Sequence, residues 1–106
     1  MYKNSVLICH NIQPGEGDET VKTYFNCDLI PNLTAWNPDL IMISCGFDAH
    51  KLDDIGKLEY SSELYGWMTR QLVKVANGKI VSTLEGGYNL QALYEASLEH
   101  VGALVE

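Results

Sequence analysis

Short apolar runs and longer stretches with apolar residues at three- and four-residue steps alternate along this chain. Four to six consecutive apolar residues between polar or turn-forming residues are typical of strands buried on both faces. Runs of this kind predict strands at residues 5–9, 40–43 and 79–84. Each run is followed by a polar loop, so the strands are expected to deliver side chains to one edge of a sheet.

Apolar residues at helical spacing predict three amphipathic helices, at residues 19–36, 63–75 and 90–105. Asp18 is the predicted N-cap of the first, and Pro31 should kink that helix or end it early. Ser61 or Ser62 should cap the second, which Asn77 and Gly78 should end in a left-handed turn. Helices between strands form long crossovers and so imply parallel strands. The sequence therefore predicts an α/β fold, a parallel sheet with helices on both faces.

The alternation places two chemically useful residues directly after predicted strands. Asp48 follows the run at 40–43, and Tyr88 follows the run at 79–84. The carboxyl ends of parallel strands meet at one edge, where α/β proteins form their ligand crevices. We expect Asp48 and Tyr88 to share such a crevice, although Asp48 alone also suits an ordinary Asx turn.

Composition narrows the choice of partners. The 106 residues suffice for one domain, and a formal net charge of −7 argues against nucleic acid or an anionic membrane as the main partner. The three cysteines form no CxxC pair, which disfavours a disulfide framework or a cysteine zinc site. No apolar run approaches the roughly 20 residues of a membrane span. An intracellular protein, nuclear or cytoplasmic, is expected.

Two motifs in order carry a family resemblance: GFDAH at residues 46–50, followed by a loop with Asp53, Ile55 and Gly56, and LEGGYNL at residues 84–90. Together they resemble the histone deacetylase family, in particular its class II members and the related acetylpolyamine amidohydrolases. The resemblance implies that residues 1–106 are a C-terminal portion of the catalytic domain, with part of an arginase/deacetylase-like fold. It further implies zinc-dependent removal of acetyl groups from acetyl-lysine, in histones or other proteins, or from acetylpolyamines.

The same resemblance assigns roles to single positions. Asp48 matches the family's aspartate ligand to zinc, and Tyr88 matches the tyrosine whose hydroxyl binds the substrate carbonyl and its oxyanion. Gly86 and Gly87 match glycines that leave room for the acyl-lysine channel, and Ile55 resembles an apolar residue of the channel wall.

The chain departs from the family pattern in its histidines. The family's remaining zinc ligands form an Asp-x-His element and its acid–base pair is His-His, both upstream of the region matched here, and this chain has no His-His pair. Catalytic zinc needs three protein ligands, so the chain alone should be inactive. The alternative is a non-catalytic α/β interaction module or dominant-negative fragment. Expected partners are an acetylated lysine peptide or polyamine, the missing N-terminal part, or a corepressor complex.

Other conspicuous residues have simpler interpretations. His50 could form an Asp-x-His pair with Asp48, but the family does not use this histidine as a ligand. His10 is expected to be a loop histidine and His100 a solvent-facing helix residue. Neither has a carboxylate or a cysteine nearby in the sequence at the spacing of metal ligands. Trp36 and Trp67 lie on apolar stripes and are expected in the core.

Overall fold

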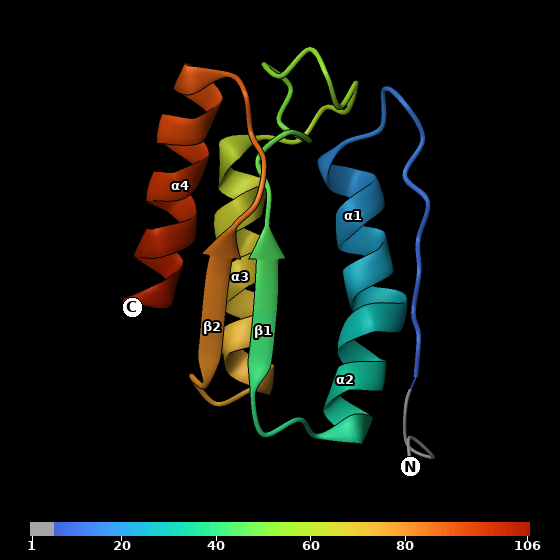
Figure 1. The fold of residues 1–106 in the computed structure, drawn as a ribbon. Helices are drawn as coiled ribbons and strands as arrows, with labels where there is room; N and C mark the ends of the chain where they lie inside the picture. The colour runs from blue at the N-terminus through green and yellow to red at the C-terminus, as the bar shows by residue number, and fades with distance from the viewer. Residues whose placement is uncertain (1–5) are drawn as a thin grey trace.

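The computed structural model describes residues 6–106, in which helical segments flank and connect two strands (Figure 1). The first helical stretch is divided into α1 (Asp18–Tyr24), the π-helix η1 (Phe25–Leu29) and α2 (Ile30–Trp36). The remaining elements are β1 (Ile41–Cys45), α3 (Ser62–Val75), β2 (Ile80–Leu84) and α4 (Leu90–Leu104).

The two strands form a parallel pair. Ile41 lies opposite Ile80 and Cys45 lies opposite Leu84. Parallel strands need a long crossover, and α3 lies between them in the chain. The predicted α/β class with a parallel sheet is therefore confirmed.

The strand predicted at residues 5–9 is wrong for the part that the structure describes. Residues 6–9 have no regular structure, and Ser5 lies outside the described residues. Val6 and Leu7 are 72% and 90% exposed. An apolar run becomes a strand only beside a hydrogen-bonding neighbour, and this segment runs along the α1–α2 stretch instead (Figure 1).

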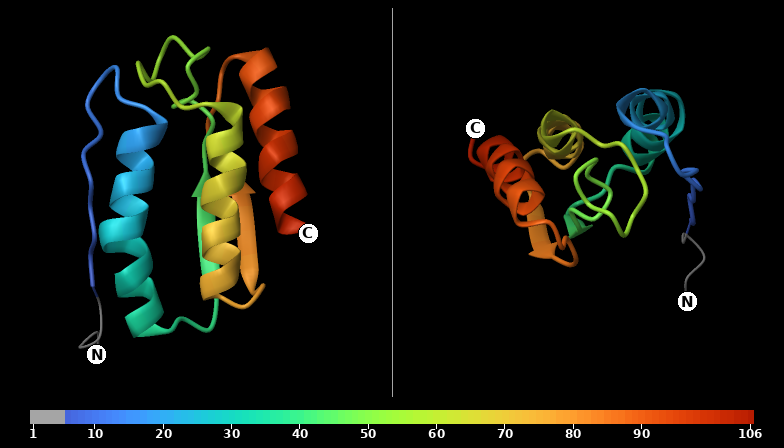
Figure 2. Two further views of the ribbon diagram at one scale, coloured as in Figure 1. Left: turned by 180° about the vertical axis from the view of Figure 1, so that it is seen from behind. Right: turned by 90° about the horizontal axis from the view of Figure 1, so that it is seen from above.

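The helices lie on one side of the strands (Figure 2). On that side, Ile43 and Cys45 pack against side chains of α3 and α4. The other side presents Met42 and Val81, which are 74% and 48% exposed. Among residues 6–106, the helices predicted for both faces of the sheet thus cover only one face.

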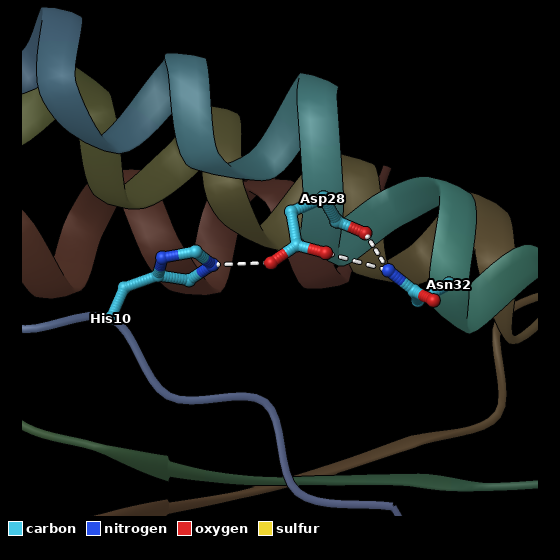
Figure 3. Close-up of polar contacts among 3 residues, drawn as sticks. All are labelled: His10, Asp28 and Asn32. Atoms are coloured by element: carbon cyan, nitrogen blue, oxygen red, sulfur yellow. Dashed lines mark hydrogen bonds and ion pairs between the residues drawn. The ribbon is translucent and has the colours of Figure 1, made fainter.

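The stretch around Pro31 shows how a proline is accommodated. The helix widens into η1 directly before it, and Pro31 enters the first turn of α2, where its missing N–H is least costly. The Asn32 amide donates to the Asp28 carbonyl oxygen at 2.8 Å and to its carboxylate at 2.6 Å (Figure 3). His10 contacts the other carboxylate oxygen at 2.8 Å and stacks on Tyr24. His10 is thus a loop histidine, as predicted, and it fastens the N-terminal segment to the helix.

The helix starts follow the sequence with one change. Ser61 Oγ accepts from the Leu64 N–H at 3.2 Å, and Asn89 Oδ1 accepts from the Ala92 N–H at 2.9 Å, so each caps its helix. Asp18, the predicted cap of the first helix, is instead its first residue, and its carboxylate accepts from Ser61 N–H and Oγ–H. The two helix starts are thereby linked. No helix within residues 6–106 is long and apolar enough to cross a bilayer.

Two predictions about burial are wrong. His100 is buried because α4 turns it toward α3 and β2, where its Nδ1 lies 2.6 Å from Thr69 Oγ1 and its Nε2 lies 2.8 Å from Ser82 Oγ. Trp36 is 58% exposed at the end of α2, whereas Trp67 is partly buried against Phe25. Helical spacing gives a stripe, but only the packing decides what covers it.

Candidate functional site

The predicted site residues lie on two loops that continue from β1 and β2. The Glu85 N–H donates to the Cys45 carbonyl oxygen at 2.9 Å, and the Phe47 N–H donates to the Gly86 carbonyl oxygen at 3.2 Å. These bonds extend the parallel ladder past the strands, so the loops lie side by side at their carboxyl ends (Figure 1). This is the edge at which the sequence predicts a crevice.

Asp48, Gly86 and Tyr88 come together there. A Cβ atom placed on Gly86 would lie 3.3 Å from Asp48 Oδ2 and 3.7 Å from Tyr88 Oη. The carboxylate and the hydroxyl therefore approach one glycine from two loops. Gly86 has a φ of +95°, a conformation that L-residues other than glycine rarely adopt. Tyr88 as a whole residue is 64% exposed.

The other two predicted channel residues occupy different surroundings. Gly87, with a φ of +118°, packs against Phe47, whose Cβ would lie 3.1 Å from a Cβ at this position. Ile55 is 67% exposed on the loop that follows β1. The role of Ile55, Gly86 and Gly87 as walls of a substrate channel stays a prediction.

Asp53 has a role that the sequence did not reveal. It is buried, its Oδ2 accepts from the Tyr88 N–H at 2.9 Å, and its Oδ1 accepts from the Ile55 N–H at 2.8 Å. The hydrogen bond from the Tyr88 backbone is the largest cause that holds the pKa of Asp53 below its ordinary value, so this carboxylate stays ionised. An aspartate two residues before Ile55 is compatible with an Asx turn, but nothing in the pattern indicates its bond to Tyr88.

Comparison with known proteins decides the family. The histone deacetylase domain profile matches residues 3–104 of this chain. The chain belongs to the histone deacetylase family. It is 45% identical over 82 residues to type-2 histone deacetylase 1 of Dictyostelium discoideum and 42% identical over 94 residues to histone deacetylase 18 of Arabidopsis thaliana. These matches include 74% and 89% of this chain, respectively.

Solved structures of histone deacetylases have the same fold. This chain superposes on histone deacetylase Clr3 with a TM-score of 0.85 at 35% identity, covering 88% of this chain, and on the HDA15 HD domain with a TM-score of 0.83 at 33% identity, covering 86%. It spans 16% of the Clr3 chain and 26% of the HDA15 chain, and 6% and 14% of the two curated relatives. The predicted arginase/deacetylase-like fold, present in part, is confirmed.

His50 is engaged elsewhere in this histone deacetylase chain. Its Nδ1 accepts from the Leu52 N–H at 3.1 Å, and its Nε2 lies 2.8 Å from Ser62 Oγ. The side chain is fully buried, and burial lowers the pKa of its imidazole. With both ring nitrogens bonded inside the protein, His50 is not available as a partner of Asp48 in metal binding.

The residues present do not complete a zinc site. Catalytic zinc in proteins has three protein ligands and an open position. Across residues 6–106, no three side chains of histidine, cysteine, aspartate or glutamate are grouped so that they could hold a metal ion. Asp48 offers one carboxylate, and the imidazole nearest to it in the sequence is bonded to Leu52 and Ser62. Within residues 6–106, Asp48 stays a single predicted zinc ligand.

Proposed function

We propose that this chain forms the C-terminal part of a class II-like, zinc-dependent deacetylase domain. The convergence of the Asp48 carboxylate and the Tyr88 hydroxyl on Gly86 is the observation that carries the proposal. The reaction class is hydrolysis of an acetyl amide, in acetyl-lysine or an acetylpolyamine. An intracellular site of action, nuclear or cytoplasmic, is part of the proposal.

The chain's own residues would perform two tasks. The Tyr88 hydroxyl, fixed beside a glycine, is suited to donate a hydrogen bond to the acetyl oxygen as negative charge develops on it. A hydrogen-bond donor that is already in position when the charge develops needs no reorganisation during the reaction. The absence of a side chain at Gly86 leaves space between this hydroxyl and the carboxylate, and a Cβ there would lie within 4 Å of both groups.

Asp48 would supply one metal-ligating oxygen. The remaining ligands and the acid–base pair have to come from outside the described residues. We therefore expect the isolated chain to hydrolyse no acetyl-lysine substrate, with or without added zinc. Turnover by the purified chain that a hydroxamate blocks would contradict this expectation.

Grafting tests the function itself. Residues 6–106 replace the matching segment of Clr3, and deacetylation of an acetyl-lysine peptide is measured. We expect the graft to be active, and Tyr88→Phe in the graft to lower kcat by about 10²–10³-fold, the usual effect of losing one oxyanion donor. Tyr94→Phe is the matched control, because Tyr94 is equally exposed but lies on α4.

Two outcomes of the graft would overturn the proposal. A folded graft that binds zinc but shows no turnover would favour the non-catalytic interaction module. Equal kcat values for the Tyr88→Phe and Tyr94→Phe variants of the graft would mean that Tyr88 takes no part in the reaction. Asp48→Asn provides a second measurement, since zinc content of the graft should fall if Asp48 is a ligand.

A further inference from the structure

Asp53 is a buried carboxylate whose hydrogen bonds join two loops of the candidate site. Its exposed fraction is 4%, and it lies 35 residues from Tyr88 in the sequence. Oδ2 accepts the Tyr88 N–H at 2.9 Å. Oδ1 accepts the Ile55 N–H at 2.8 Å and the Gly56 N–H at 3.4 Å. One side chain thus binds the loop after β2 and the turn that follows β1.

The same turn lies directly on Asp48. A Cβ on Gly56 would be 1.9 Å from the carbonyl oxygen of Asp48, so the two backbones are in close contact and only a glycine fits. By binding the Gly56 and Ile55 N–H groups, Asp53 fixes the surface against which the Asp48 backbone rests. By binding the Tyr88 N–H, it fixes the backbone from which the hydroxyl projects.

We propose that Asp53 is a positioning residue that holds the Tyr88 hydroxyl and the Asp48 carboxylate in a fixed relation. It touches neither group and acts through the backbone of each loop. The turn before it is itself anchored, because the Asp53 N–H donates to the His50 carbonyl oxygen at 2.9 Å and the His50 imidazole is fully buried. Its ionised state fits this role, since a carboxylate accepts from several N–H groups at once.

Amide hydrogen exchange on the full chain tests the positioning directly. Asp53→Ala removes both acceptors, and we expect exchange of the Tyr88 and Ile55 amides to accelerate about ten- to a hundredfold, the range for hydrogen bonds to a charged group. Asp53→Asn keeps one acceptor oxygen and places an NH₂ group opposite the other N–H, so at least one amide should lose protection. Amides within α3 and α4 should keep theirs.

Asp54→Asn is the matched control, because it removes the same charge from the exposed neighbour. It should leave Tyr88 and Ile55 protection unchanged. Three results would overturn the proposal: a Tyr88 amide that exchanges in the wild-type chain as fast as that of Leu7, Tyr88 protection that survives Asp53→Ala, or equal losses in α3 and α4. Equal losses of protection in α3 and α4 would mean that Asp53 stabilises the fold as a whole and does not specifically position the two loops.

A kinetic measurement separates this inference from the proposed function on which its catalytic consequence rests. In the Clr3 graft, Asp53→Asn should lower kcat at least tenfold with KM changed less than twofold, and Asp54→Asn should change neither. If a folded graft that binds zinc is inactive, the proposed function fails, and amide exchange still decides whether Asp53 holds the loops. If kcat is unaffected in an active graft, the bonds of Asp53 have no part in catalysis.

Discussion

Gly56→Ala measures how tightly the turn after Asp53 packs on Asp48. The added Cβ would lie 1.9 Å from the Asp48 carbonyl oxygen, whereas ordinary contact begins at 3.4 Å, so the two backbones have to separate by about 1.5 Å. No side-chain rotation relieves this contact, because both partners belong to the backbone. Overpacking typically costs about 1–3 kcal/mol, and we expect Gly56→Ala to fall at the upper end, near 3 kcal/mol.

Two other glycines separate steric conflict from backbone effects. Gly102 lies exposed in α4 with nothing within 4 Å of its Cβ position, so Gly102→Ala should stabilise the chain by about 0.5–1 kcal/mol. Gly78 also faces open space but has a φ of +81°, so Gly78→Ala should cost about 1–2 kcal/mol through backbone strain alone. Of these three substitutions, Gly56→Ala is the one that combines a permitted φ with a backbone clash.

Thermal and urea unfolding followed by circular dichroism give the comparison. A loss near 3 kcal/mol corresponds to a fall in melting temperature of roughly 10–25 °C for a domain of this size. If the free energy of unfolding of Gly56→Ala is within about 0.5 kcal/mol of the wild-type value, the turn is not in tight contact with the Asp48 backbone. In that case Asp53 does not position Asp48 through Gly56, while its bond to Tyr88 is tested independently by amide exchange.

Two further predictions concern stability. Burial lowers the pKa of both His50 and His100, so the unfolded chain binds more protons below about pH 6.5, and the free energy of unfolding should fall as the pH drops from 7.5 to 5.5. His100→Gln should reduce that fall, and an unchanged fall would exclude His100 as its source. Met42→Thr, on the exposed face of β1, should change the free energy of unfolding by less than about 0.5 kcal/mol. Ile43→Thr, on the covered face, should cost about 1–3 kcal/mol in the same urea titration, and equal effects would refute the one-sided packing.

Local signals in the sequence located most of the fold. Asn77 and Gly78 take φ values of 53° and 81° after α3, as their residue types predict. The Ser61 cap and the two paired strands are also found where the pattern places them. These features depend on backbone conformation and on the spacing of apolar residues, and both are determined by residues close together in the sequence. The first apolar run lacked the partner that a strand needs, so its pattern was not sufficient.

The site was predictable to the extent that it follows from topology. Asp48 and Tyr88 follow two parallel strands, and parallel strands bring their carboxyl ends to one edge, so their meeting at Gly86 could be expected. The roles of these residues in metal binding and catalysis stay predictions. The sequence predicts Asp53 only as part of a loop, because a hydrogen bond across 35 residues leaves no periodic or local signal.

The sequence by itself determined the two paired strands, the ends of α3, the resemblance to histone deacetylases and the loops that carry the candidate site. The tertiary structure alone decided which surfaces are covered. In the folded chain His100 is buried between two hydroxyl groups, whereas Trp36 and Met42 are exposed. The buried Asp53 carboxylate accepts a hydrogen bond from the Tyr88 N–H. Burial and long-range hydrogen bonds are set by which elements pack together. The spacing of residues along one helix or strand does not indicate which other elements pack against it.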